Sequence, residues 1–214
     1  GVIDSYTHDI GEAVEGADMI FLAIPLGAMR DAFMAMKGHL AEKAVITDGG
    51  SVKGSVIADC EAVFGEILPN FVPGHPIAGT EKNGVEASFT ELYENRRVIL
   101  TPVSETDESA IARVHAMWSH CGAEINRMSP VDHDRVLAAT SHLPHMLAFA
   151  LVDMLSRVDY EEDIFKYAAG GFRDFTRIAS SNPVMWRDIC IANKDAVASL
   201  VESYADEMMD LARA

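Results

Sequence analysis

The sequence predicts a fold in two parts, an α/β domain with a doubly wound parallel sheet followed by an all-helical domain. Up to about residue 128, short apolar runs alternate with segments of helical period. From residue 129 to residue 214, nearly every segment has helical period. The predicted domains are therefore 1–128 and 129–214.

Short apolar runs mark the strands of the first domain. The run 19–24 is apolar throughout and is stopped by Pro25, which is typical of a parallel strand that is buried on both faces. Strands that alternate with helices favour a parallel sheet with crossover helices. The predicted strands are 19–24, 44–47, 70–75, 97–101 and 123–128, and the predicted helices are 26–40, 53–64 and 106–120.

The second domain is predicted to consist of the helices 131–157, 161–180 and 183–213. Ser129 before Pro130, and Asn182 before Pro183, have the pattern of an N-cap followed by proline in the first helical turn. Helices this long cannot bury their apolar faces within so small a domain. We therefore expect a homodimer formed through the helical domain.

Composition excludes several classes of protein. The net charge of −16 and the pI of about 4.7 disfavour contact with a nucleic-acid backbone. The longest uninterrupted apolar run, 19–25, is too short to span a bilayer, so no membrane contact is expected. The cysteines are few and widely spaced, without a metal-binding or disulfide pattern, which predicts a reduced, cytoplasmic protein: Cys60, Cys121 and Cys190.

One expected motif does not occur. A Rossmann-type nucleotide-binding domain normally opens with a strand, a glycine-rich turn and a helix, with an acidic residue about 20 residues further on. The chain instead passes from Gly1 to an apolar run that reads as a later strand. We therefore expect a partial Rossmann-type sheet in an N-terminally truncated fragment.

Two segments that follow predicted strands carry candidate functional residues. Asp48-Gly-Gly-Ser51 lies at the carboxyl end of a strand, where open α/β sheets bind ligands, and the helix that follows favours negative charge. The alternative is a turn in which Ser51 caps that helix. His75, between Gly74 and Pro76, could accept a proton near neutral pH, or could simply be a loop histidine bonded to backbone.

The helical half carries two further motifs. His142 and His145 share one helix face, where they could bind a metal, contact a substrate or be buried and hydrogen-bonded. Arg173 and Arg177 form a local cation pair beside Asp174, suited to gripping a carboxylate or to a solvated ion pair. No nucleophile elbow of the Gly-x-Ser-x-Gly type occurs, which disfavours hydrolysis.

In order along the chain, these segments resemble the prephenate/arogenate (cyclohexadienyl) dehydrogenases of tyrosine biosynthesis. Any single motif is weak, and the ordered set is specific. The matching stretches are 17–25, 48–53, 75–81, 100–102, 133–134, 141–145, 170–179 and 183–186.

The resemblance implies a nucleotide-binding domain, a helical dimerisation domain, and NAD, or in some members NADP, as cofactor. It implies that the substrate, prephenate or arogenate, is oxidised and decarboxylated in the cytoplasm, with tyrosine as a feedback ligand in some members. By resemblance, His75 contacts the ring hydroxyl of the substrate and Ser51 supports that histidine. The residues that line the cofactor site are then Ile24, Pro25, Asp48 and Ser51.

The resemblance also assigns substrate contacts in the helical domain. Arg177 matches the arginine that holds the ring carboxylate. The remaining substrate residues by resemblance are His145, Gly170, Asp174 and Trp186. No metal is implied, and the acidic residue that would distinguish NAD from NADP lies outside the chain.

Two alternatives stay open on the sequence. One is another β-hydroxyacid-type dehydrogenase, a class that normally carries a catalytic lysine and asparagine on its first interdomain helix, where residues 130–155 contain neither. The other is a dimeric ligand-binding fragment that has lost its cofactor site. The first differs in substrate, and the second would bind a substrate analogue without binding NAD.

Overall fold

The computed structural model describes residues 3–79, 84 and 87–214. The chain forms two compact units. The first contains residues 3–79 and 89–134, and the second contains 135–214 with the described residues among 80–88. The division falls after Asp134, because the start of the helix that begins at Pro130 is bonded to the first unit.

The first unit contains two three-stranded sheets. In one, β1 (Met19–Leu22), β2 (Val45–Asp48) and β3 (Phe71–Val72) are parallel, with Leu22 paired to Asp48. In the other, β5 (Arg97–Leu100) runs parallel to β6 (Glu124–Arg127) and antiparallel to β4 (Gly74–Pro76). The predicted strand 70–75 is thus divided at Pro73, which cannot donate a ladder hydrogen bond. The sheet is mixed there rather than parallel throughout.

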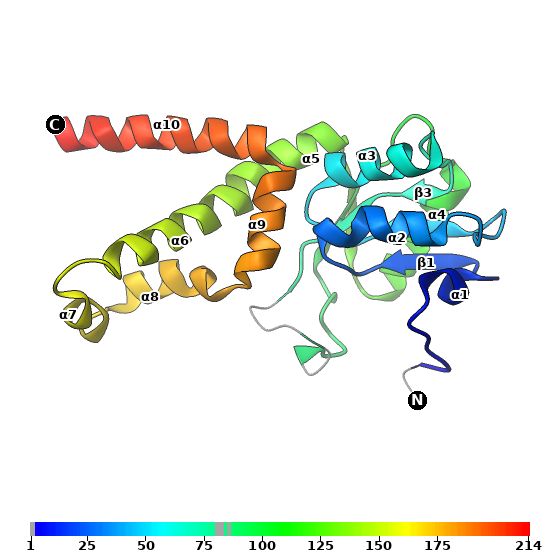
Figure 1. Ribbon diagram of the computed structural model, residues 1–214, viewed down its shortest axis with the longest axis horizontal. Helices are drawn as coiled ribbons and strands as arrows, with labels where there is room; N and C mark the ends of the chain where they lie inside the picture. Colours follow the sequence, from blue (N-terminus) through cyan, green and yellow to red (C-terminus); the bar gives the residue numbers. More distant parts are fainter. Residues whose placement is uncertain (1–2, 80–83, 85–86) are drawn as a thin grey trace. The chain divides into compact units, whose positions relative to one another are not determined.

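Helices cover both faces of the parallel strands (Figure 1). Ile46 and Phe71 pack with α2 (Met29–Met36) and α3 (Lys53–Phe64), whereas Val45 and Val72 pack with α4 (Glu108–His120). Neighbouring residues of one strand face opposite sides, so an apolar run with no polar alternation requires cover on both faces. This confirms the doubly wound arrangement. The remaining helical segments of this unit are α1 (Ile10–Val14) and the 3-10 turn Leu26–Ala28.

The second unit is helical. Both predicted N-caps are confirmed, since Ser129 accepts from the amide of Asp132 and Asn182 accepts from the amides of Val184 and Met185. The predicted helices 161–180 and 183–213 are each broken, the first near Gly170 and the second at Asn193. The helices are α5 (Pro130–Leu137), α6 (Leu143–Leu155), α7 (Glu161–Lys166), α8 (Gly170–Thr176), α9 (Pro183–Ala192) and α10 (Lys194–Arg213), with a 3-10 turn at Arg177–Ser180.

A π-helical turn, Ala138–His142, joins α5 to α6. The continuous helical stretch Pro130–Leu155 is long and apolar enough to cross a membrane by length and composition. Core helices of soluble proteins pass the same test, and His133 and His142 in this stretch are buried and hydrogen-bonded to other parts of the protein. The stretch is therefore weak evidence for a membrane span.

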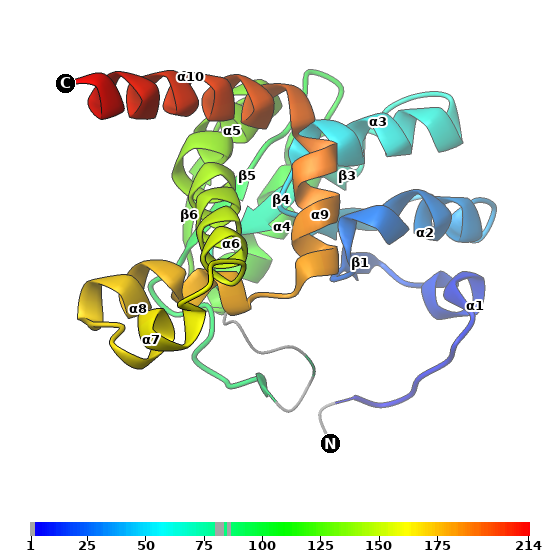
Figure 2. The ribbon, with the colours of Figure 1, turned by 60° about the vertical axis from the view of Figure 1, so that its left-hand side comes forward.

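The last helix, α10, has little cover within the chain. Figures 1 and 2 both show it extending to the C-terminus, and every residue from 201 to 214 is exposed. Large apolar side chains are exposed at intervals of three or four residues along it: Val201, Tyr204, Met208 and Leu211. A repeated apolar stripe at this spacing is typical of a helix that packs against another helix.

Candidate functional site

A buried ion pair organises the turn after β2. Lys53 Nζ donates to Asp48 Oδ2 at 2.5 Å, and both side chains are 0% exposed. Lys53 also donates to the carbonyl of Gly74, while Asp48 accepts from the amides of Gly50 and Gly74. The ion pair of Lys53 and Asp48 therefore holds the turn 49–52 next to the backbone of Gly74, which immediately precedes His75.

His75 belongs to a chain of hydrogen-bonded side chains. Its Nδ1 lies 2.9 Å from Nε2 of His133, and Nδ1 of His133 lies 2.8 Å from Oδ1 of Asp134. The Asp134 carboxylate also accepts from the amides of Lys53 and Gly54, both at 2.8 Å. Asp134 thus satisfies amides in the first turn of α3, the positive end of the helix dipole.

Two ionisable groups here have shifted pKa values. Burial lowers the pKa of Lys53, because it removes the ammonium from water, and the Asp48 carboxylate opposes part of that effect. Burial by itself would raise the pKa of Asp134. The hydrogen bonds from His133 and from the Lys53 and Gly54 amides outweigh it, so the pKa of Asp134 lies below its ordinary value.

The carboxyl ends of β1 and β2 lie side by side. The amide of Gly49 donates to the carbonyl of Leu22, and a side chain added at Gly49 would meet the Phe21 ring at 3.3 Å. Pro25 is exposed and Ile24 is half-buried beside this turn. This edge is where parallel α/β sheets bind ligands.

Ser51 does not cap the helix that follows it. The N-cap position is Val52, which makes no side-chain cap, and Asp134 bonds to the first amides of the helix instead. The interpretation of Ser51 as a cap is therefore wrong. Ser51 is half-buried, and its hydroxyl makes no hydrogen bond to any residue that the structure describes, which leaves it available to a ligand.

Aromatic side chains gather in the second unit. The His145 ring stacks on Trp186 with ring centroids 3.5 Å apart and planes inclined by 17°. Nδ1 of His145 lies 2.9 Å from the carbonyl of Ser141, so it must carry a proton, and in the neutral ring Nε2 is then an acceptor. Burial lowers the pKa of His145, and the hydrogen bond to the Ser141 carbonyl opposes part of that effect. The lowered pKa favours the neutral ring.

Trp186 is buried, and its Nε1 has no hydrogen-bond partner among the described residues. Nδ1 of His142, on the same helical stretch as His145, lies 3.2 Å from the side-chain nitrogen Nδ2 of Asn193. Both histidine rings therefore contact Trp186, His142 edge-on with ring centroids 6.1 Å apart, and the hydrogen-bond partners of the two histidines differ. In the described part of the chain, no group of three or more His, Cys, Asp or Glu side chains is placed to hold a metal.

The predicted substrate residues on α8 and directly after it are exposed. Gly170, Asp174 and Arg177 all have exposed surface, and a side chain added at Gly170 would meet nothing within 4 Å. Arg177 begins the 3-10 turn that packs along α6, the helix that carries His145. The guanidinium is therefore presented on the surface of the second unit, on a segment that packs against the helix of the stacked histidine.

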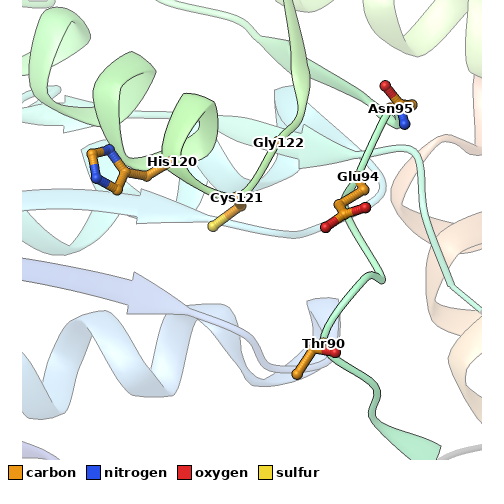
Figure 3. Close-up of a pocket in the computed structure, with 6 residues that line it drawn as sticks. All are labelled: Thr90, Glu94, Asn95, His120, Cys121 and Gly122. Atoms are coloured by element: carbon orange, nitrogen blue, oxygen red, sulfur yellow. The ribbon is translucent and has the colours of Figure 1, made fainter.

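A shallow hollow in the first unit has no part in this arrangement. Figure 3 shows it beside the turn from α4 into β6 and the loop that leads into β5. These are the amino-terminal ends of the two strands, whereas Ile24, Pro25 and Ser51 follow the carboxyl ends of β1 and β2. Its lining contains none of the predicted site residues and consists of Thr90, Glu94, Asn95, His120, Cys121 and Gly122.

Comparison with known families covers almost the whole chain. Residues 1–127 match the family domain described as "Prephenate dehydrogenase, nucleotide-binding domain". Residues 129–214 match "Prephenate dehydrogenase, dimerization domain". The chain belongs to the prephenate dehydrogenase family.

Individual prephenate dehydrogenase relatives agree. The chain is 42% identical over 212 residues to the cyclohexadienyl dehydrogenase of Zymomonas mobilis, covering 97% of this chain and 71% of the relative. It is 36% identical to the prephenate dehydrogenase of Bacillus subtilis, of which it spans 56%, with 97% of this chain covered. The chain is thus shorter than either relative.

Solved structures give the same family. The crystal structure of the Aquifex aeolicus prephenate dehydrogenase with hydroxyphenyl propionate and NAD+ has a TM-score of 0.90 and 44% identity, covering all of this chain and 74% of that one. The Synechocystis arogenate dehydrogenase has a TM-score of 0.81 and 27% identity, covering 99% and 76%. Both support the α/β domain followed by a helical domain.

Sequence reasoning found part of this prephenate dehydrogenase site. It placed Asp48 among the cofactor contacts, which stays a prediction; in the structure its carboxylate is fully buried and bonded to Lys53, Gly50 and Gly74, so it positions the turn. It gave no role of their own to Lys53, His133 and Asp134. The pair His133-Asp134 was part of the resemblance, and that was the signal that could have drawn attention to it.

Proposed function

We propose that the protein catalyses the NAD-dependent oxidative decarboxylation of prephenate, arogenate or both, giving 4-hydroxyphenylpyruvate or tyrosine. Its family makes it an oxidoreductase of this type. The observation that carries the proposal is His75, bonded to His133 beside the carboxyl edge of the parallel strands. An imidazole in this position can accept a hydroxyl proton near neutral pH.

The residues at the strand edge fit a nicotinamide cofactor. Ile24 and Pro25 offer apolar and exposed surface. Gly49 and Gly50 carry no side chain that would keep the backbone of the turn away from a ligand, and Ser51 offers a hydroxyl. When bound, NAD supplies the acceptor for the hydride that leaves the carbinol carbon. A relative's structure that contains NAD+ supports this choice, and NADP stays an alternative that the cofactor assay distinguishes.

The side chains have complementary roles in this chemistry. His75 draws off the proton of the ring hydroxyl, and Arg177 holds the ring carboxylate that leaves as carbon dioxide. Loss of that carboxylate makes the ring aromatic, which drives the reaction. We assign the other end of the substrate to Gly170, Asp174, Trp186 and the Nε2 acceptor of His145, with the buried Trp186 Nε1 as a hydrogen-bond donor.

A turnover panel tests the proposed function. We expect reduction of NAD with prephenate or arogenate, accompanied by release of carbon dioxide, and no turnover with simple 3-hydroxy acids. Turnover of 3-hydroxy acids alone would assign the protein to another dehydrogenase class. Binding of hydroxyphenyl propionate without binding of NAD, measured by calorimetry, would indicate a ligand-binding protein without a cofactor site.

Replacing Arg177 with alanine is expected to raise KM roughly ten- to a hundredfold, because one charged hydrogen-bonded contact contributes about 1.5–3 kcal/mol. Steady-state kinetics measures the change. Arg173→Ala, on the preceding turn of the same segment, is the matched control and should leave KM near its original value. An unchanged KM for Arg177→Ala would place the carboxylate elsewhere.

We propose that the protein forms a homodimer through its helical unit. The exposed stripe on α10 supports this, since Leu211 is 69% exposed and Met208 is 46% exposed. Covering such side chains contributes about 1.5–3 kcal/mol each when burial is complete. A match to a family dimerization domain supports the same assignment.

The variant Met208→Glu/Leu211→Glu is therefore expected to shift the dimer toward monomer in light scattering at micromolar concentration. Ser203→Glu adds the same kind of charge to another face of α10 and should leave the mass unchanged. A double variant that keeps the wild-type mass would remove this stripe from the interface.

The compartment and a regulatory ligand complete the proposal. Cys60, Cys121 and Cys190 are free thiols, which supports a reducing compartment, the cytoplasm. Feedback by tyrosine stays a prediction, tested by adding tyrosine to the turnover assay.

A further inference from the structure

The direction of each hydrogen bond in the chain from Asp134 to His75 follows from the donors around the carboxylate. Asp134 accepts from the amides of Lys53 and Gly54, and its lowered pKa keeps it ionised at neutral pH, so it is an acceptor. The proton shared with His133 therefore resides on Nδ1 of that histidine. Nε2 of a neutral His133 then has a lone pair to offer.

The same reasoning extends to His75. When His133 is neutral its Nε2 accepts, so the nitrogen that faces it, Nδ1 of His75, carries a proton. Nε2 of His75 is then the unprotonated nitrogen, which is the one that can accept a proton from a substrate. His133 is 0% exposed, so water cannot readily replace it as the partner.

We propose that His133 and Asp134 are positioning residues that hold His75 in the tautomer with Nδ1 protonated and Nε2 ready to accept the substrate's hydroxyl proton. This rests on the proposed function and adds to it a cause for the basicity of one particular nitrogen. The hydroxyl proton would pass to Nε2 while NAD, when bound, would accept the hydride from the carbon that bears the hydroxyl. Once the ring carboxylate has left as carbon dioxide, the oxygen of the aromatic ring would take the proton back from Nε2, which gives the phenol. The imidazolium formed at His75 faces a chain that ends in a carboxylate, which stabilises its charge.

Asp134 has a second task in this arrangement. Its two oxygens bond to the first amides of α3, immediately after the turn that contains Ser51. One carboxylate therefore sets both the orientation of the histidines and the position of the helix that follows the cofactor turn. If His133 served only for packing, its two ring nitrogens would not need to face His75 and Asp134, and the Asp134 carboxylate would not need to bond to both His133 and α3.

The tautomer can be read directly by nitrogen-15 NMR of the full-length wild-type enzyme, without any variant. We expect the His75 signals of a neutral ring whose Nδ1 is protonated and whose Nε2 is not. Assignment comes from the spectrum of His75→Asn. A ring with Nε2 protonated would overturn the proposal, whatever the enzyme turns over.

Two substitutions of His133 interrupt the hydrogen-bonded series from Asp134 to His75 at different points. Asparagine places an amide near the former Nδ1, so it keeps a contact with Asp134 and loses His75. Glutamine reaches the former Nε2, so it can keep a contact with His75. We expect His133→Asn to lower kcat by roughly ten- to a hundredfold, as when partners that orient metal-binding histidines are removed, with KM little changed. His133→Gln should retain more activity.

A double-mutant cycle separates positioning from structure. If His133 acts through His75, His133→Asn lowers kcat in the wild type and has no further effect in the His75→Asn background. Equal losses in both backgrounds would overturn the proposal, since they would indicate general damage to the fold. If His75→Asn itself leaves kcat unchanged, the proposed function of His75 fails, and the NMR result still reports on the tautomer.

Discussion

Replacement of His75 by asparagine is expected to lower kcat by about a hundredfold or more, the usual contribution of a positioned acid–base group. Asparagine keeps a polar group near Nδ1, so the contact with His133 can survive while the accepting nitrogen is lost. The loss should therefore appear in kcat more than in KM. Steady-state rates with prephenate and NAD measure it.

An exposed histidine provides the control. His120 ends α4, beside the hollow of Figure 3, and His120→Asn should leave kcat unchanged. Retention of full kcat by His75→Asn would remove this residue from the mechanism. Equal losses in the two variants would point to a general effect of removing histidine.

The second large effect is expected from Lys53→Met. It removes one partner of a buried ion pair and leaves the Asp48 carboxylate buried, which typically costs about 3–5 kcal/mol. Urea denaturation followed by circular dichroism measures the lost free energy of unfolding. Because Lys53 also bonds to the carbonyl of Gly74, we expect the folded fraction to lose activity as well.

A surface pair calibrates that measurement. Asp153 lies on α6 and Arg157 lies two residues after it ends. The guanidinium nitrogen of Arg157 is 2.9 Å from Oδ2 of Asp153, and the two side chains are 69% and 66% exposed. Arg157→Met should cost less than about 1 kcal/mol, because water screens the pair and the side chains lose entropy in forming it. A Lys53→Met variant as stable as Arg157→Met would show that the buried pair contributes little.

Local patterns predicted the elements better than their pairing. The helix 53–64 agrees with α3 in both bounds, and the strand 19–24 contains β1. The break at Gly170 was missed because the apolar period continues across it. The antiparallel pairing of β4 was also missed, since a pairing partner about 25 residues distant leaves no local mark.

The site divides in the same way. Ser51 stands out locally as a residue in the turn after β2, and His75 as a histidine between glycine and proline, although His75 lies within β4 rather than in a loop. The contacts of Asp134 with Lys53 and Gly54 join residues 80 and 81 positions apart, and His75 and His133 are 58 apart. Hydrogen bonds over such separations depend on the tertiary fold, so the local pattern around Asp134 does not predict them.

The π-helical turn Ala138–His142 has a consequence for everything that follows it along the helix. A wide turn accommodates one residue more than an α-turn, and each residue of an α-helix advances about 100° around the axis. If the same residues were wound as an even α-helix, the one residue that the wide turn absorbs would rotate the His145 ring by roughly that angle, away from the Trp186 indole on which it now stacks. The wide winding of this five-residue segment is therefore as much a determinant of the aromatic stack as the chemistry of its side chains.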